Sequence, residues 1–349
     1  MSRRCALLLL LFAFPAILLA QVEDARDRAS LGFSGPVRFV KESIYLSHHF
    51  KVKGLRFKEA EKSVLTGFSE LHFDSAGWLT VQRLFQESPF RDQTDSFTFD
   101  SRQRLVGHQW QAGGRSLGRT EHRYNLIGQR ISFRQYDDTG AFFCETAYRY
   151  RGGLLSEEKT YSRAHAIISE THYTYDSLKR LVREEALPNP YRYSIPYVKE
   201  YAYDGGGNLC MIRYVERGGE NRWTYRRQSD ASGKMLSEST YDAADSLTRI
   251  HTFKYNRRGQ VVAEMADDGR LKQEIRYSYR HGRLEWMQNR FGDTDFRTFY
   301  LRYDEWGNWV EKADFDGINL QVTTREITYG DQPLNMKKTA PSKQSPAQR

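Results

Sequence analysis

Aromatic residues alternate with small or polar residues along most of this chain. Several aromatic pairs stand two residues apart, as in Tyr173/Tyr175, Tyr201/Tyr203, Phe253/Tyr255 and Tyr277/Tyr279. Successive side chains of a β-strand point to opposite faces, so this spacing predicts strands with one aromatic face. Aromatic side chains also suit the pleated, half-buried surface of a sheet. The pattern therefore predicts an all-β protein with almost no helix.

One aromatic position acts as an anchor that recurs at intervals of 22 to 30 residues. The eleven anchors are Phe73, Phe99, Tyr124, Tyr150, Tyr175, Tyr203, Tyr225, Tyr255, Tyr279, Tyr303 and Tyr329. A period of this length is typical of a supersecondary unit copied in tandem, in which each copy buries its apolar face against the next. Residues 35–330 are therefore predicted to form one array of tandem β-hairpin repeats, capped by an atypical first unit over residues 44–70.

Short polar motifs after the anchors predict hairpin turns. Asp or Asn follows the anchor in seven copies, and Gly stands four residues after it in five, as in residues 303–307. Asp or Asn at the turn entry bonds the backbone two residues on, and Gly supplies the positive φ that the returning strand needs. Further turns midway through several repeats give each unit about two strands. Some twenty strands at about 4.8 Å each would span about 100 Å, so we expect a long antiparallel sheet that twists or curls. The pattern leaves open whether this sheet closes.

The ends of the chain differ from the array. Residues 1–20 predict a secretory signal peptide, because Arg3 and Arg4 precede an apolar run that ends at Ala20 and is too short for a comfortable membrane span. We therefore expect an exported protein in the periplasm, at the cell surface or in the medium, without a transmembrane anchor. Residues 21–34 form a short charged lead. Residues 331–349 are rich in Pro, Lys, Ser and Gln and predict a disordered basic tail.

The charge distribution bears on the possible partners, and the cysteine positions bear on a possible disulfide. The formal net charge is +9, but the ends carry much of it and leave about +4 for residues 21–330. Basic residues that interleave with tyrosines follow from a strand with Tyr on one face and Arg on the other, so no nucleic-acid partner is expected. Cys144 and Cys210 lie in different repeats, where a disulfide would require the sheet to close, and their pairing stays open.

Motifs that carry chemistry are weak in this sequence. Residues 114–118 match G-x-S-x-G, yet they lead into the Tyr124 strand rather than a helix, which indicates a loop between hairpins. His48 and His49 are adjacent and would point to opposite faces of a strand, so they do not predict a metal site. Four pairs of neighbouring acids, such as Glu157-Glu158 and Glu184-Glu185, are expected at turns or on solvated faces rather than in one cleft. We predict no enzyme activity, no cofactor and no metal.

Two groups of aromatic residues are candidates for partner contact. Pro188, Pro190 and Pro196 predict a loop over residues 187–197 that leaves the sheet, because proline cannot donate to a strand ladder. Tyrosines on such a loop could bind a partner or instead fold back and plug an open sheet edge. Tryptophans near turns could stack on sugars or proteins, or else cap the aromatic face. The candidate partner-binding residues are Tyr191, Tyr193, Tyr197, Trp306 and Trp309. A second excursion is expected around residues 226–234.

The segments YDEWGNWVEK from Tyr303, YDGGGNLCMI from Tyr203 and YNRRGQVVAE from Tyr255 resemble the repeats of the YD-repeat, or RHS-repeat, family of bacterial secreted and surface proteins. The resemblance covers roughly residues 35–330 and implies β-hairpin units. Large members of this family wind their repeats into a hollow shell around a toxic C-terminal domain, and related modules occur in insecticidal toxin complexes and animal teneurins. This chain has only about ten units and little sequence after Tyr329, so a closed shell with cargo is not expected.

These observations favour an exported, non-enzymatic binding or scaffold protein at the periplasm or cell surface, with a protein or an envelope glycan as partner. Two alternatives remain open at this point. One is a carbohydrate-binding module for envelope glycans, and the other is an accessory component of a polymorphic toxin system. The ligand and the oligomeric state cannot be read from the pattern.

Overall fold

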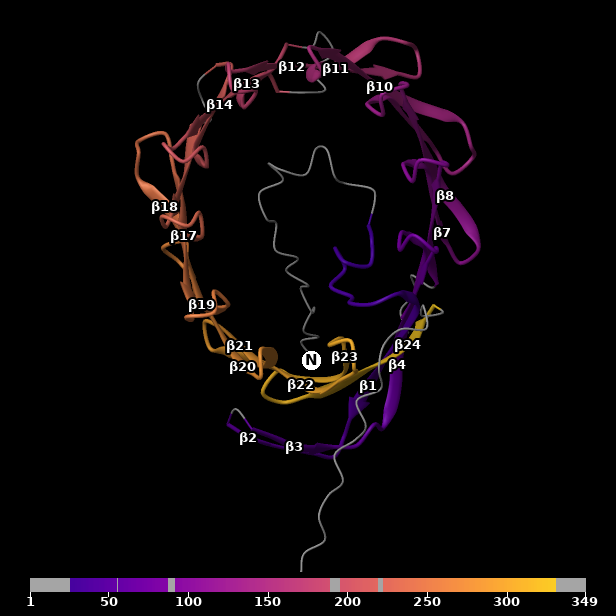
Figure 1. Cartoon of the computed structure of the whole chain (residues 1–349), viewed down its shortest axis with the longest axis vertical. Coiled ribbons are helices and arrows are strands. Elements are labelled where there is room, and N and C mark those ends of the chain that lie inside the picture. Colours follow the sequence, from indigo (N-terminus) through magenta and orange to yellow (C-terminus); the bar gives the residue numbers. More distant parts are fainter. Residues whose placement is uncertain (1–25, 55, 87–91, 189–194, 219–221, 331–349) are drawn as a thin grey trace, which may run out of the picture.

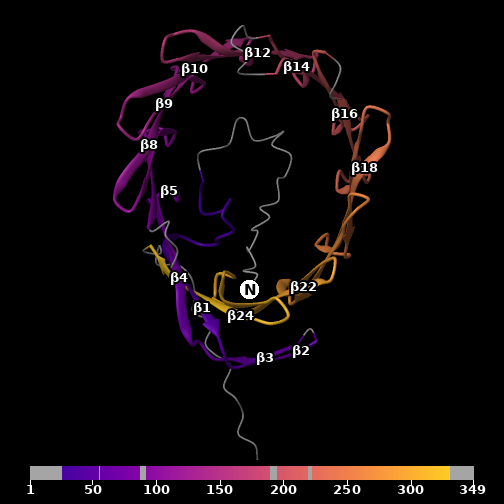
Figure 2. The same cartoon turned by 180° about the vertical axis from the view of Figure 1, so that it is seen from behind.

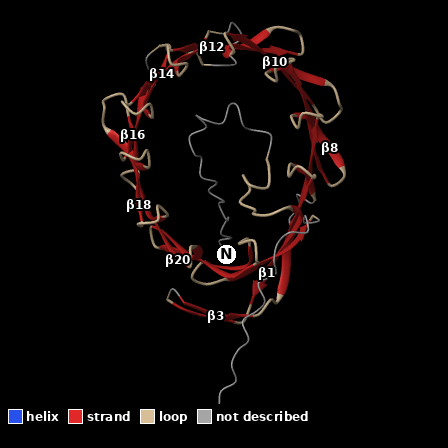
Figure 3. Cartoon of the chain, in the orientation of Figure 1, coloured by secondary structure: helices blue, strands red, loops and turns tan. Residues whose placement is uncertain are grey.

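The computed structural model describes residues 26–54, 56–86, 92–188, 195–218 and 222–330. Within these ranges the chain forms 24 β-strands joined by turns and short loops, and it contains no helix (Figure 3). The prediction of an all-β protein is confirmed. It follows that no helix in the described part of the chain is long and apolar enough to cross a membrane.

The strands are mostly seven to eleven residues long, which suits the spacing of the turns. The first half comprises β1 (Val37–Ser47), β2 (Phe50–Lys53), β3 (Arg56–Ala60), β4 (Val64–Phe73), β5 (Leu79–Gln86), β6 (Gln93–Phe99), β7 (Leu105–Ala112), β8 (Arg115–Tyr124), β9 (Arg130–Tyr136), β10 (Phe142–Arg151), β11 (Leu154–Ser162) and β12 (Ile167–Tyr175). The second half comprises β13 (Leu181–Ala186), β14 (Tyr197–Tyr203), β15 (Leu209–Glu216), β16 (Arg222–Ser229), β17 (Met235–Tyr241), β18 (Leu247–Tyr255), β19 (Val261–Asp267), β20 (Lys272–Arg280), β21 (Arg283–Phe291), β22 (Thr294–Tyr303), β23 (Trp309–Phe315) and β24 (Leu320–Tyr329).

Twenty-two of these strands form one antiparallel sheet that closes into a ring (Figure 1). From β4 to β24 each strand pairs with the next along the chain. The first strand, β1, then inserts between β24 and β4 and pairs with both. The expectation of a long, curled sheet is therefore correct only in part. The sheet closes completely, and the strand that closes it, β1, is not one of the repeats.

The turns after the anchors have the expected chemistry. In the turn that follows Tyr203, Oδ1 of Asp204 accepts hydrogen bonds from the backbone N–H groups of Gly206 and Asn208 at 2.9 and 2.8 Å. Gly207 completes the turn with a φ of 83°. Four turns place a residue with a side chain at the corresponding left-handed position, with φ from 57° to 63°: Gln103, His165, Lys179 and Asp245.

The anchor tyrosines also fasten neighbouring strands together. Six of them donate the hydroxyl hydrogen to a backbone carbonyl near the start of the preceding strand at 2.5–2.9 Å: Tyr124 to Leu105, Tyr150 to Arg130, Tyr203 to Leu181, Tyr255 to Met235, Tyr279 to Val261 and Tyr303 to Leu284. Each bond joins the end of one strand to the start of the strand before it, across the open end of their hairpin, so these six anchors have a structural role.

One anchor was assigned wrongly from the sequence. Tyr225 lies in the middle of β16, and the turn of that unit follows Ser229 instead, where Oδ1 of Asp230 accepts from the backbone N–H groups of Ser232 and Lys234. Ser229 stands 26 residues after Tyr203 and 26 before Tyr255, so the period stays regular. The expected excursion at residues 226–234 is therefore wrong, because this segment is a strand end and a tight turn.

The two faces of the closed sheet are covered differently. Figures 1 and 2 both show the described residues of the lead, 26–34, inside the ring, and hairpin β2–β3 outside it. The guanidinium of Arg325 in β24 lies 4.7 Å from the ring of Phe33 in the lead, so it points inward. Phe315 of β23 packs on Phe50 of β2 with ring centroids 5.6 Å apart, so it points outward.

The hydrophobic core is concentrated where the ring closes. On the inner side, Phe33 of the lead packs with a cluster of buried residues: Val37, Val40, Phe73 and Leu79. On the outer side, hairpin β2–β3 covers a second cluster of buried residues: Ala313, Leu320 and Val322. The segment expected to cap the array, residues 44–70, thus contains the hairpin that covers the junction, together with the end of β1 and the first part of β4.

Candidate functional site: the inner face of the ring

The inner face of the far side of the ring carries a row of acidic and phenolic side chains. Residues directly opposite each other in an antiparallel pair share a face, so the pairing registers carry the inward assignment of Arg325 around the sheet. The inward side chains that concern us are Glu158, Tyr173, Glu184, Tyr197, Lys199, Tyr201, Tyr225, Glu238, His251, Glu264 and Tyr277, which we call the inner polar row.

Glu184 of β13 is held by three donors from the next strand. Its carboxylate accepts from the hydroxyls of Tyr197 and Tyr201 at 2.5 and 2.7 Å and from the ammonium of Lys199 at 2.9 Å. Burial alone would raise the pKa of Glu184, but these bonds outweigh it and lower the pKa. The same burial raises the pKa of Tyr197 and Tyr201, so both stay protonated as donors.

Glu158 of β11 has a single strong partner. The hydroxyl of Tyr173 in β12 donates to it at 2.5 Å. Burial raises the pKa of Glu158, with the nearby charge of Glu184 adding to the effect, and one hydrogen bond does not offset it. This carboxyl group therefore binds protons more readily than Glu184 does.

His251 of β18 lies between two carboxylates of the flanking strands. Its Nδ1 is 3.3 Å from Glu238 and its Nε2 is 3.1 Å from Glu264. Burial disfavours the charged ring, but the hydrogen bonds to both carboxylates outweigh burial and raise the pKa of His251 to about 9. The carboxylates also accept from the hydroxyls of Tyr225 and Tyr277, each at 2.8 Å.

The carboxylates and phenols of the inner polar row are engaged with one another and are not activated for catalysis. Its carboxylates are bonded by tyrosines, a lysine and a histidine from adjacent strands, and its phenols have raised pKa values that disfavour the phenolate. Such a wall offers satisfied polar groups and aromatic edges rather than an activated nucleophile or base. It is suited to contact with a polar chain.

A polypeptide already lies against the inner face near the closure. The lead forms backbone hydrogen bonds from Arg28 N to Gly77 O and from Leu79 N to Arg26 O, both at 2.9 Å, and Asp27 bridges to Trp78. Phe33 is buried against the inner cluster, with 5% of its surface exposed. The lead, which forms turns over residues 28–32, is thus held inside the ring by backbone bonds at the β4–β5 turn and by one buried side chain.

The structure separates the tyrosines that the sequence grouped on one loop. Tyr191 and Tyr193 lie outside the described residues. Tyr197 is the first residue of β14, its ring is tilted against that of Tyr214 with centroids 5.3 Å apart, and its hydroxyl bonds Glu184. The expectation that Tyr197 leaves the sheet is wrong, because the hydrogen bond to a buried carboxylate holds it in the inner polar row.

The two tryptophan candidates lie near the closure and are already in contact with the protein. Trp306 stacks on Tyr329 with ring centroids 5.8 Å apart and presses so closely on Gly35 that a Cβ there would lie 2.5 Å from its ring. Trp309 has the guanidinium of Arg325 at 3.4 Å from its ring centroid. Both rings are half-buried, so these contacts favour the structural interpretation over a sugar-stacking platform.

The other residues considered for chemistry have structural explanations. Cys144 and Cys210 are both free, so the pairing that the sequence left open does not occur. Ser116 of the G-x-S-x-G string lies in β8, a strand rather than the loop expected there. A cluster that sequence reasoning missed brings Glu157, Glu170 and His172 within 4.8 Å of one another on the outer face.

The ammonium of Lys159 lies 3.2 Å from Glu157 and 3.3 Å from Glu170, so this cluster is an ion-pair network that already has its cation.

The inner polar row was missed as well, because Glu158 and Glu184 were taken as solvated. The signal was the alternation itself, since neighbouring acids on a strand must face opposite sides and one of each pair faces inward.

Comparison with known proteins gives two relatives. The chain is similar to the probable deoxyribonuclease RhsA and the probable deoxyribonuclease RhsB of Dickeya dadantii (strain 3937), each 26% identical over 283 residues. The match covers 78% of this chain and 16% of each relative, so the chain spans about one sixth of their length. No protein-family model matches the chain.

Among solved structures, the chain is similar to a Photorhabdus luminescens Tc holotoxin pore that contains TccC3. The identity is 14%, and the match covers 71% of this chain and 18% of that chain. The TM-score is 0.20, which supports no argument about the overall arrangement.

Proposed function

Because the chain belongs to the RHS/YD-repeat family, we propose that it is a non-catalytic shell component of a toxin-associated system, exported to the periplasm or cell surface, whose closed sheet encloses a polypeptide. The deoxyribonuclease in the relatives' names describes proteins of which this chain spans 16%, so that activity is not carried over. The enclosed polypeptide is the partner in this proposal.

The observation that carries the proposal is the lead bound to the inner face. Residues 26–34 form backbone hydrogen bonds with the start of β5 and insert Phe33 between inward side chains. A ring interior that already holds one segment through backbone groups and a buried aromatic ring has the chemistry to hold another polypeptide segment, since backbone groups and satisfied polar side chains do not require a particular sequence.

The size of the ring agrees with this role. Twenty-two strands at about 4.8 Å give a circumference of about 105 Å and a backbone diameter of about 34 Å. Subtracting about 5 Å for the side chains of each wall leaves about 24 Å, wider than a helix of 10–12 Å and narrower than most folded domains. Closed sheets of this many strands are not filled by their own side chains. The proposed cargo is therefore an extended or helical segment.

Photo-crosslinking from matched positions tests the enclosure. Met287 pairs with Tyr277 and faces inward, whereas Met265 pairs with Glu274 on the outer face. Each would be replaced in turn by p-benzoyl-phenylalanine, in the full chain expressed in its native host, and the exported fraction would be irradiated. We expect a crosslinked polypeptide from position 287 and little from position 265.

Two outcomes would contradict this proposal. Equal crosslinking from Met287 and Met265 would mean that the partner does not distinguish the two faces. Recovery of crosslinks only within the chain itself, at both positions, would mean that no polypeptide is enclosed. Circular dichroism and melting of both variants provide the control that each still folds.

A further inference from the structure

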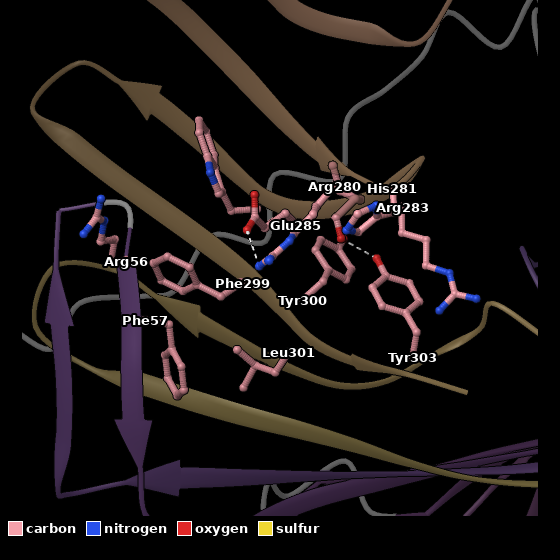
Figure 4. A pocket seen from close by; sticks show the side chains of 12 residues that line it. Arg56, Phe57, Arg280, His281, Arg283, Glu285, Phe299, Tyr300, Leu301 and Tyr303 are labelled. Atoms are coloured by element: carbon pink, nitrogen blue, oxygen red, sulfur yellow. Dashed lines mark hydrogen bonds and ion pairs between the residues drawn. The ribbon is translucent and has the colours of Figure 1, made fainter. Parts of the chain in front are cut away.

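A cleft of about 930 Å³ lies on the outer side of the ring, between hairpin β2–β3 and strands β20–β22 (Figure 4). It is formed because the hairpin crosses the sheet as an added layer and ends above β21 and β22. The guanidinium of Arg297 in β22 donates to the carbonyl of Gly54 at the hairpin end at 2.7 Å and holds this wall in place. Trp286 and Phe299 in its floor lie on the outer face, so an occupant there would contact the opposite side of the sheet from an enclosed polypeptide.

The rim of the cleft is cationic. Arg56, Arg280, His281 and Arg283 line it, and Figure 4 shows their side chains around the opening. The one acid among the lining residues is Glu285, whose carboxylate lies 4.0 Å from Arg280. Arg56 is exposed, and the side chain of Arg280 is 74% exposed. Three arginines facing one glutamate leave an excess of positive charge for an anionic occupant.

The floor of the cleft is aromatic and apolar. Phe57 of β3 packs on Phe299 of β22 with ring centroids 5.8 Å apart, and Trp286 and Leu301 continue the surface on the outer side. Phe299 is 3% exposed and lies beneath Phe57. An occupant with apolar or aromatic side chains on one face would bury them here.

One wall of the cleft is a strand edge. Within the described residues, β3 pairs with β2 alone. Figure 4 shows Arg56 and Phe57 on the strand of the hairpin that borders the cleft. An unpaired strand edge beside a groove can add an extended peptide through main-chain hydrogen bonds, with pockets for alternate side chains supplying specificity.

We propose that this cleft binds an acidic, extended peptide of another protein, which adds a strand to β3, places alternate side chains on the aromatic floor and directs its carboxylates to Arg56, Arg280 and Arg283. The chain's own residues 331–349 do not fit this chemistry, since they carry Lys337, Lys338, Lys343 and Arg349 against Asp331. An acidic glycan would satisfy the arginines but leave the strand edge unpaired.

The test uses the full chain and a fluorescein-labelled octapeptide in which Glu alternates with Val or Phe, measured by fluorescence anisotropy. Three comparison ligands separate the contributions: the same peptide with Lys for Glu, the same peptide with two internal prolines and unchanged charge, and a galacturonate hexamer. We expect measurable binding of the acidic peptide, and binding weaker by about tenfold or more for the lysine and proline versions.

The cleft variant R56E/R280E alters two exposed side chains, and R115E/R151E is the matched control, because both of its arginines are exposed and lie at strand ends of β8 and β10. The cleft variant should weaken peptide binding by about tenfold and the control by less than about twofold, with unchanged melting temperatures for both.

Each other outcome overturns the proposal. Equal affinity for the acidic peptide and its proline version would mean that charge attraction alone accounts for binding, without strand addition. Tighter binding of the galacturonate hexamer than of the peptide would identify a glycan site. Equal loss in R56E/R280E and R115E/R151E, or no binding of the peptide at millimolar concentration, would remove the cleft as a docking site.

Discussion

The closure of the ring and its far arc are built from the same kind of strand but are stabilised in different ways. The closure, comprising β24, β1, β4, β5 and hairpin β2–β3, contains most of the fully buried aliphatic side chains: Val37, Val40, Leu79, Leu320 and Val322. The far arc, from β10 to β20, has few such residues and relies on the inner polar row and the anchor tyrosines.

This difference follows from the separation of the paired strands along the chain. Arg325 and Glu42, which pair across the closure, are 283 residues apart. Bringing together the ends of a flexible loop of about 280 residues costs about 5 kcal/mol of chain entropy, whereas a loop of about a dozen residues costs about 2 kcal/mol. Neighbouring hairpins in the arc need only modest contacts, while the closure requires dense apolar packing on both faces.

The largest expected effect is at the closure itself. Val40→Asp would place a carboxylate at a position with no exposed surface, opposite Leu71 and Ile327, and an unpaired buried charge costs several kcal/mol. We expect β1 to detach and the amide protons of β24 and β4 to lose their protection from hydrogen exchange.

Ile212→Asp is the matched change in the arc, where Ile212 is 2% exposed. Its loss of protection should be confined to β14, β15 and β16. If Val40→Asp kept the protection of β24, or if Ile212→Asp abolished it, the closure would not be the region on which the ring depends.

A second comparison concerns the outer cluster under hairpin β2–β3. Leu320→Ala removes a side chain with no exposed surface, so we expect the free energy of unfolding to fall by about 2–5 kcal/mol. Ile318→Ala, two residues away but 82% exposed, should change it by less than about 0.5 kcal/mol. Urea denaturation measures both, and similar losses would mean that the hairpin does not bury this cluster.

The arc should be sensitive to pH in a way that the closure is not. The folded pKa of His251 is raised to about 9 from an ordinary value near 6.5, so its charged ring stabilises the fold fully below about pH 6.5, and this stabilisation is lost as the pH rises through about 9. We expect the wild-type protein to lose about 1–3 kcal/mol between these values through this group.

In His251→Gln this loss should be absent, so the stabilities of the two proteins should converge as the pH rises from about 6.5 to about 9. Melting curves at intervals across this range measure the difference. A constant difference between wild type and variant over the whole range would show that the ring is not charged between Glu238 and Glu264.

The smallest expected effect tests one anchor of the arc. Tyr255→Phe removes the hydroxyl that donates to the carbonyl of Met235 at 2.7 Å, and such a bond contributes about 1 kcal/mol. The control Tyr241→Phe removes a hydroxyl whose contact with Ser239 is 3.4 Å long, so it should cost less than about 0.5 kcal/mol. Equal losses would mean that the ring, rather than the bond, accounts for the anchor.

Much of the repeat could be predicted because its determinants are local. Asp204 specifies a turn through its side-chain carboxylate and Gly207 through its positive φ, so their spacing is visible in the sequence. Ser229 was missed because the turn tolerates a serine before Asp230, and the aromatic ring at Tyr225 imitated an anchor. The aspartate of the turn was therefore a more reliable marker of the repeat than the aromatic anchor.

The closure and the inner polar row could not be predicted from these local signals. The pairing of β1 with both β24 and β4 depends on the curvature that accumulates over the whole array, which no single repeat encodes. Glu158 and Glu184 look like surface residues in the sequence, and only the closed ring determines that their side of the sheet is the inner one. Closure therefore decides which residues form the site.

The position of β1 also sets the order in which the protein can be completed. Its partner β24 is made last, about 270 residues after β1 leaves the ribosome, which corresponds to roughly 15–60 s of synthesis at typical rates. Every hairpin from β4 onward can form during that time, but β1 must wait for β24 before it has both neighbours. A chain cut short anywhere before β24 can hold its repeats yet never complete the ring, so closure reports that the whole array has been translated.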